Sequence, residues 1–134
     1  MRRFTKKRAR LNRAADKWRK EYLRAVGRCD LCGRWDGLSL HELGRARGAN
    51  REKSLTADYA ILVLCLSNPG TGRIGCHETV QNWNELKQLA LLFHVRGERY
   101  DLEKYLKLTS PNAVKRIEQY EVDVEITLLT SPSP

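Results

Sequence analysis

Residues 29–33 read Cys-Asp-Leu-Cys-Gly, and this stretch decides the fold because two more cysteines follow at positions 65 and 76. A Cys-x-x-Cys-Gly turn brings two thiolates to one metal ion, and a second pair completes the ligand set of a structural zinc. A disulfide framework needs an oxidising compartment, which nothing in the sequence indicates. A redox pair would leave the later cysteines unexplained. Four unrelated buried thiols are the remaining alternative, and the spacing favours a zinc site formed by Cys29, Cys32, Cys65 and Cys76.

Positive charge is concentrated immediately before this motif. The net charge is +9, and residues 1–28 contain twelve Lys or Arg against two acids, whereas the rest of the chain contains thirteen bases and fourteen acids. Such a field attracts a polyanion because binding releases its condensed counterions. A solubilising tail or a solvated helix face is the alternative. The segment lacks the sustained apolar face of a membrane-surface helix.

Length and composition predict one soluble domain. The chain has 134 residues, of which 41% are hydrophobic and 31% charged, and this length suits a single domain. No apolar run reaches the roughly 18 residues that a bilayer span requires. The basic start is not followed by an apolar stretch, so it does not resemble a secretory signal. We expect a cytoplasmic protein that has no membrane partner.

Hydrophobic spacing predicts the elements around the cysteines. In chain order these are a helix over 5–26, strand-like segments over 35–43 and 59–66, and helices over 78–93, 102–108 and 111–120. Residues 44–58 have the composition of a loop rich in Gly and Arg. The last helix has Ser110 as its expected N-cap and Pro111 at its first position. We expect the three tryptophans, Trp18, Trp35 and Trp83, to belong to the core.

The hydrophobic residues of the C-terminal segment recur at every second position. Val122, Val124, Ile126 and Leu128 alternate with acidic or polar residues, which predicts a terminal strand. The expected organisation is therefore a single α+β domain with four parts. These are a basic N-terminal helix (1–26), a zinc-bound core (27–95), C-terminal helices with a strand (96–130) and a disordered tail (131–134).

The order of these features resembles the HNH endonucleases, and most of all the small zinc-containing versions found in bacteriophages. The segments that carry the resemblance are Cys-Asp-Leu-Cys-Gly at 29–33, His-Glu-Leu-Gly-Arg-Ala-Arg-Gly at 41–48, Val-Leu-Cys at 63–65 and Gly-Cys-His at 75–77. They cover roughly residues 27–83, a little under half of the chain. Some phage-type members of the family have His-Glu where most have His-His or Asp-His.

The resemblance implies a ββα-metal core, in which two strands pack against a helix and one divalent cation lies between strand and helix. His41 and His77 are the implied cation ligands, with Gln81 at the place of a further ligand. The residue that deprotonates the attacking water is normally a second histidine, and Glu42 stands there. A carboxylate can be a general base when its surroundings tune its pKa toward neutrality. Glu42 as a ligand, or paired with a nearby arginine, is the alternative, and His77 could instead replace Cys76 at the zinc.

Two positions depart from the family pattern. The asparagine that names the family usually lies five residues before the third cysteine, and that position is Ala60. Gln81 offers a neutral amide oxygen, which suits hard cations rather than zinc. His94 lies at the end of a predicted helix, where a favourable interaction with the helix dipole explains it.

The implied function is a metal-dependent DNA endonuclease that hydrolyses phosphodiester bonds. It would hold a structural Zn²⁺ and a catalytic cation such as Mg²⁺, Mn²⁺, Ni²⁺ or Zn²⁺, and phage packaging or recombination proteins are possible partners. The expected DNA contacts are Arg45, Arg47, Arg51, Arg8, Arg10, Arg13 and Lys17. The main alternative is a zinc-containing DNA-binding module that keeps the scaffold without cleavage. A third is a protein that docks its basic helix onto an acidic partner.

Overall fold

The computed structural model describes residues 6–44, 46 and 50–130, with the side chains of residues 7 and 8 outside the described part. Its elements begin with α1 (Lys6–Val26), β1 (Leu38–Glu42), α2 (Asn50–Ser54), a short 3₁₀ turn (Asp58–Ala60) and β2 (Ile61–Cys65). The second half contains α3 (Cys76–Gln81), α4 (Glu85–Arg96), a 3₁₀ turn (Gly97–Arg99), α5 (Leu102–Thr109), a 3₁₀ segment (Pro111–Arg116) and α6 (Ile117–Thr130). The fold class is α+β, as predicted.

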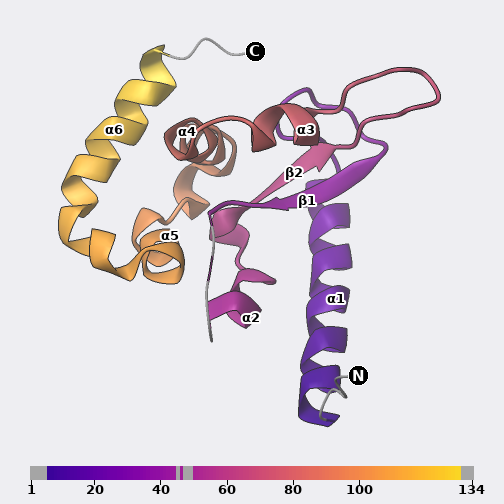
Figure 1. Ribbon diagram of the computed structural model, residues 1–134, viewed down its shortest axis with the longest axis horizontal. Helices are drawn as coiled ribbons and strands as arrows, with labels where there is room; N and C mark the ends of the chain where they lie inside the picture. Colours follow the sequence, from indigo (N-terminus) through magenta and orange to yellow (C-terminus); the bar gives the residue numbers. More distant parts are fainter. Residues whose placement is uncertain (1–5, 45, 47–49, 131–134) are drawn as a thin grey trace.

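The sheet is small and lies between α1 and the C-terminal helices α4, α5 and α6 (Figure 1). Its two strands are antiparallel, with Leu38 opposite Cys65 and His41 opposite Leu62. All of β2 is buried, whereas β1 is only partly covered. Helix α3 contacts both strands, and α1 contacts β1. The sheet therefore links the cysteine segments to the rest of the domain.

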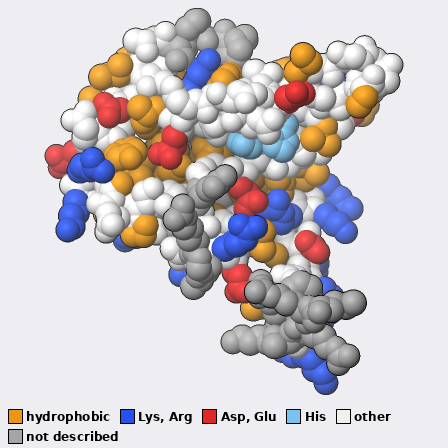
Figure 2. Space-filling view, in the orientation of Figure 1, with side chains coloured by type: hydrophobic (Ala, Val, Ile, Leu, Met, Phe, Trp, Pro, Cys, Tyr) orange, Lys and Arg blue, Asp and Glu red, His pale blue; other side chains and the backbone are white. Residues whose placement is uncertain are grey.

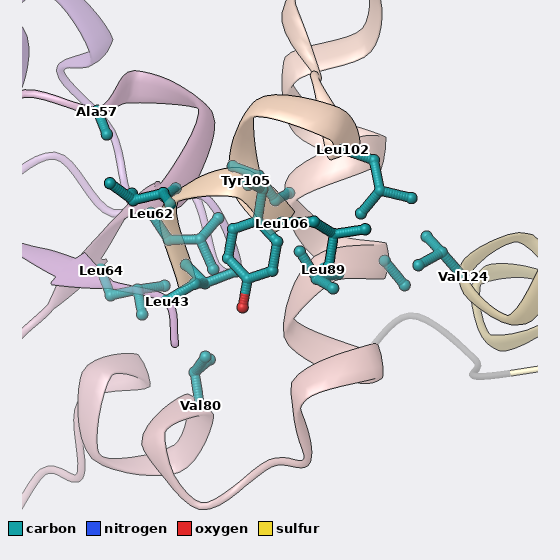
Figure 3. Close-up of a cluster of buried hydrophobic side chains, with 14 of the residues drawn as sticks. Leu43, Ala57, Leu62, Leu64, Val80, Leu89, Leu102, Tyr105, Leu106 and Val124 are labelled. Carbon is teal, nitrogen blue, oxygen red and sulfur yellow. The ribbon is translucent and has the colours of Figure 1, made fainter. Parts of the chain in front are cut away.

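The main core lies between β2 and the C-terminal helices. Figure 3 shows side chains of β2, α4, α5 and α6 converging around the Tyr105 ring. Leu62, Leu89 and Leu106 are completely buried. The burial of each leucine side chain contributes roughly 2 kcal/mol to the stability of the fold, so these contacts hold α4 and α5 against the sheet.

The predicted terminal strand is wrong, because residues 117–130 form the helix α6. Val124 and Leu128 are four residues apart, so a helix places both on the side that packs against the core. Val122 and Ile126 then face solvent. Contacts with α4 decide the structure here, since the preference of β-branched residues for strands depends on context.

Three other predicted elements differ in detail. The helix expected over 78–93 is two helices, because Asn84 ends the connection after α3 and caps α4 by accepting a hydrogen bond from the Lys87 backbone N–H at 2.8 Å. The segment expected as a loop over 44–58 contains α2, and residues 45 and 47–49 lie outside the described part. The helix expected over 111–120 begins as a 3₁₀ segment, and Ser110 makes no side-chain capping bond to a described residue.

The three tryptophans differ in how far they are buried. Trp83 packs against the core, and Trp18 is half-buried and stacks on Tyr22 with ring centroids 4.9 Å apart. Trp35 is 77% exposed, so its assignment to the core is wrong. The predicted tail, 131–134, lies outside the described residues. Among the described helices, none combines the length and apolar character needed to cross a membrane.

Candidate metal centre and adjoining cleft

The four cysteines converge. Their sulfur atoms all lie within 4.8 Å of one another, and the sulfurs of Cys32 and Cys65 are 3.7 Å apart. A zinc ion bound by four sulfurs at about 2.3 Å separates neighbouring sulfurs by about 3.8 Å. The donor set and its size therefore fit a tetrahedral ion such as Zn²⁺. Cys76, and not His77, supplies the fourth donor of this cluster.

Two glycines allow the backbone to reach this arrangement. Gly33 has φ of +80° and donates its N–H to the Cys29 carbonyl at 2.9 Å. This bond closes the Cys-x-x-Cys-Gly turn at residues 29–33, which we call the first knuckle. Only glycine adopts such a φ without strain. At Gly75, a Cβ atom would overlap the backbone of residues 65–67. The close approach at Gly75 brings Cys76 beside the end of β2.

Hydrogen bonds to the Cys65 sulfur favour its thiolate form. The Arg73 guanidinium donates to this sulfur at 2.8 Å, and the Cys76 backbone N–H donates at 3.4 Å. Burial alone would raise the pKa of Cys65, but the bonds from Cys76 and the other cysteines lower it to about 7. Burial and the neighbouring thiols raise the pKa of Cys76. A metal ion would replace the protons that the thiols otherwise keep.

A buried ion pair ties the first knuckle to the core. Asp30 lies between Cys29 and Cys32, and both of its carboxylate oxygens accept hydrogen bonds from Arg96 of α4 at 2.9 Å. The same carboxylate accepts the Val63 backbone N–H at 2.7 Å. Arg96 also donates to the Tyr22 hydroxyl of α1. Helix α1, strand β2 and helix α4 are therefore joined through Asp30 and Arg96.

His41 and His77 face each other beside the cysteine cluster. His41 lies near the end of β1, and His77 lies in the first turn of α3, directly after Cys76. Their ring centroids are 5.0 Å apart and the ring planes are inclined by 70°. Figure 2 shows histidine side chains gathered on the surface over the sheet. The cluster positions α3, and α3 brings His77 to β1.

Hydrogen bonds fix which nitrogen of each ring carries the proton. The Ser39 hydroxyl donates to the Leu64 carbonyl, so its oxygen accepts a bond from Nδ1–H of His77 at 2.9 Å. The Gln88 amide N–H donates to the Trp83 carbonyl, so its oxygen accepts from Nε2–H of His41 at 2.8 Å. The lone pairs are therefore on Nε2 of His77 and Nδ1 of His41. Metal-binding histidines commonly donate their other N–H to a protein acceptor in this way.

His77 is kept neutral. Burial lowers its pKa, and the neighbouring His41 lowers it further. A neutral imidazole is the form that can bind a metal ion.

A polar cleft of about 770 Å³ opens beside His41. Residues lining it include His41, Glu42, Gln81, Glu85 and Gln88. Two carboxylates, two amides and an imidazole thus face one space, which suits a hard cation and a water molecule.

The Tyr105 hydroxyl lies buried behind the cleft, next to Gly44. Burial and then the Glu85 carboxylate raise the pKa of Tyr105. This hydroxyl therefore stays protonated near neutral pH.

The residues expected to contact DNA fall into two groups. Arg10, Arg13 and Lys17 are exposed along one stripe of α1, and Figure 2 shows Lys and Arg side chains along the described part of this helix. Arg51 is exposed on α2 and lines a second hollow of about 450 Å³ together with Glu42. Arg45, Arg47 and the side chain of Arg8 lie outside the described residues.

Sequence patterns did not identify Ser39, Glu85 or Gln88 as site residues. Ser39 precedes His41 by two positions on a strand, so the two side chains point to the same face of the sheet. This spacing could have identified Ser39 from the sequence. Glu85 and Gln88 reach the cleft only because the chain breaks at Asn84 and α4 turns back toward β1. Comparison with protein-family models, curated proteins and solved structures found no match.

Proposed function

We propose that the chain is a metal-dependent DNA endonuclease of the HNH type. In this proposal β1, β2 and α3 form the ββα-metal core. His41 and His77 bind the catalytic cation, and Gln81 is a further oxygen ligand. The cysteine cluster holds a separate structural zinc that keeps α3 against the sheet.

The observation that carries the proposal is the pair of histidines with fixed tautomers. One ring comes from β1 and the other from α3, and each donates its N–H to a protein acceptor. Each ring keeps a lone pair on the remaining nitrogen. His41 lines the polar cleft together with two carboxylates and two amides, and the His77 ring lies against His41.

Phosphodiester hydrolysis requires a base, an attacking water and charge stabilisation at the phosphate. Glu42 is exposed at the end of β1 and lines the cleft, so it can accept the proton of a water molecule as that water attacks phosphorus. A divalent cation bound here would neutralise charge on the phosphate and stabilise the departing oxygen. Glu85 faces the same space and is a second candidate base.

The basic surfaces suit the DNA backbone. Arg10, Arg13 and Lys17 have spacings of three and four residues, so one stripe of α1 can follow a line of phosphates. Arg51 lies on the side of Glu42 away from α3 and can hold a phosphate near the cleft. Contacts of this kind fix orientation and make binding strongly dependent on salt.

The test is plasmid nicking by the zinc-loaded chain in the presence of Mg²⁺, Mn²⁺, Ni²⁺ or added Zn²⁺. The His41→Ala, His77→Ala double variant should lose cleavage and keep DNA binding. His94→Ala is the matched control, because His94 is exposed on α4 away from the cleft residues, and it should cleave normally. Glu42→Gln should lower the rate by about 10²- to 10⁴-fold, and Glu85→Gln tests the second carboxylate.

The absence of nicking with every cation, together with intact DNA binding, would overturn the proposal. The DNA-binding module without catalysis would then be the better description. Cleavage that survives in the double variant would locate the chemistry elsewhere or reveal a contaminating nuclease.

A further inference from the structure

Exposed hydrophobic side chains gather at the zinc end of the molecule. Trp35 is 77% exposed, Ile74 69% and Leu66 48%. Each lies within three residues of a cluster cysteine, namely Cys32, Cys76 and Cys65. We call Trp35, Leu66 and Ile74 the knuckle patch.

Backbone contacts bring together the three segments that carry these residues. The Leu66 N–H donates to the Gly37 carbonyl at 2.7 Å, which joins the end of β2 to the turn that follows Trp35. On its other side, Leu66 lies directly against Gly75, the neighbour of Ile74. The loop between β2 and α3 projects beyond the sheet at this end (Figure 1).

Polar contacts hold the backbone on both sides of Trp35. The Cys29 N–H donates to the Arg34 carbonyl at 2.6 Å, and Arg34 pairs with Asp36 on either side of Trp35. Large apolar side chains that are exposed together mark an interaction surface.

The charged residues near the knuckle patch indicate which kind of ligand binds there. The end of α1 leads into the first knuckle and carries Arg24 and Arg28, and neither forms an ion pair with another described residue. Asp30 is neutralised by Arg96, and Asp36 by Arg34. Arg28 precedes Cys29, whose N–H bonds to the residue before Trp35, so the first knuckle carries both unpaired positive charge and an exposed indole. This combination suits a chain of phosphates and bases. In a duplex the bases are already stacked on one another, so an indole can stack only on an unpaired base.

We propose that Trp35 is a stacking platform for unpaired bases, so that the DNA substrate carries a single-stranded segment next to the cleft. Arg24 and Arg28 contact the phosphates of that segment, and Leu66 and Ile74 contact the edge of the stacked base. The inference rests on the proposed function for its choice of DNA, and it adds the substrate class.

The test compares the binding of the full zinc-loaded chain to a labelled 20-nucleotide oligo(dT) and to a 20-base-pair duplex, by fluorescence anisotropy without added catalytic cation. Trp35→Ala should weaken single-strand binding by about 5- to 100-fold and change duplex binding by less than about twofold. Trp35→Phe should recover most of the loss because it restores a ring. Oligo(dT) should quench the tryptophan fluorescence of the wild type more than that of Trp35→Ala.

Leu129→Ala is the matched control, since Leu129 is 85% exposed but lies near the end of α6, and its binding should be unchanged. Zinc content and the melting temperature of each variant establish that it is folded. Equal loss on both DNAs, or loss on the duplex alone, would overturn the inference in favour of a duplex contact. No loss on either would overturn it in favour of a protein partner at the knuckle patch.

The outcome is separable from the nuclease proposal. Single-strand binding that depends on Trp35, without nicking under any condition, would keep this inference and reject the nuclease. Nicking that depends on His41 and His77, together with binding that ignores Trp35, would do the reverse.

Discussion

The end of the molecule that contains the four cysteines and the layer formed by α4, α5 and α6 are stabilised in different ways. The cysteine end has the clustered sulfurs, the Asp30–Arg96 pair and backbone hydrogen bonds, and it leaves Trp35 and Ile74 exposed. The helical layer buries leucines completely around Tyr105 (Figure 3). The candidate site contains His41 and His77 from the first region and Glu85 and Gln88 from the second. Its chemistry therefore depends on both kinds of stabilisation.

Removing zinc should give the largest effect. Treatment with a chelator, or the Cys65→Ser substitution at the buried end of β2, should lower the melting temperature by at least about 10 °C. A structural zinc contributes on the order of 10 kcal/mol in small domains, and each kcal/mol shifts the melting temperature of a domain this size by about 4 °C. Circular dichroism melts and elemental analysis, with one zinc per chain expected, measure the effect.

A melting curve that does not change after complete metal removal would contradict this prediction. The helical layer would then be sufficient for the fold. In that case the cysteines would be free thiols that lie together for other reasons.

Breaking the link between the two regions should rank second. Arg96→Met leaves the Asp30 carboxylate buried, with the Val63 N–H as its remaining hydrogen-bond donor among the described residues. The loss of one member of a buried pair costs about 3–5 kcal/mol, so the urea midpoint should fall strongly. Adding Asp30→Asn should recover part of the loss, because the unpaired charge is then removed.

An exposed pair supplies the comparison for this result. Arg34 and Asp36 form an ion pair with side chains 39% and 52% exposed, and Arg34→Met should cost less than about 1 kcal/mol. Similar losses for the two arginine variants would show that the Asp30–Arg96 pair does not join the regions.

A cavity in the helical layer should have the third largest effect on stability and should leave zinc binding unchanged. Leu106 is completely buried in α5, and Leu106→Ala should lower the free energy of unfolding by about 2–4 kcal/mol. Zinc content should remain at the wild-type level. Loss of zinc from this variant would show that the two regions fold as one cooperative unit.

The sequence was most informative where chemistry depends on spacing. The four cysteines and the order of α1, β1, β2 and α5 were predicted, because cysteine spacing and helical stripes are local signals. The strand predicted at Val122 to Leu128 failed because two patterns coexist in that segment. Val124 and Leu128 fit a helix that packs on α4, and only the tertiary contact chooses between the two periods.

The candidate site was predicted in part for the same reason. His41, His77 and Gln81 were expected from the resemblance of their motifs to a known family, and those motifs were visible along the chain. The cleft residues Glu85 and Gln88 depend on where the chain turns after α3. Trp35 was assigned to the core because a tryptophan is usually buried, but the structure leaves it 77% exposed.

Changing the turn between α3 and α4 should affect stability less than the cavity at Leu106 does. The Asn84 side chain accepts the Lys87 N–H and so satisfies one free donor at the start of α4. Asn84→Ala should cost about 1 kcal/mol, whereas Asn84→Asp should be nearly neutral because aspartate also caps well. Urea unfolding measures both. If the turn also aims Gln88 at His41, then Asn84→Ala should lower nicking more than Leu106→Ala does, relative to the stability that each loses. A nicking rate that simply follows stability in both variants would mean that packing alone holds α4 in place, and that the helix break is a consequence of the cleft rather than its cause.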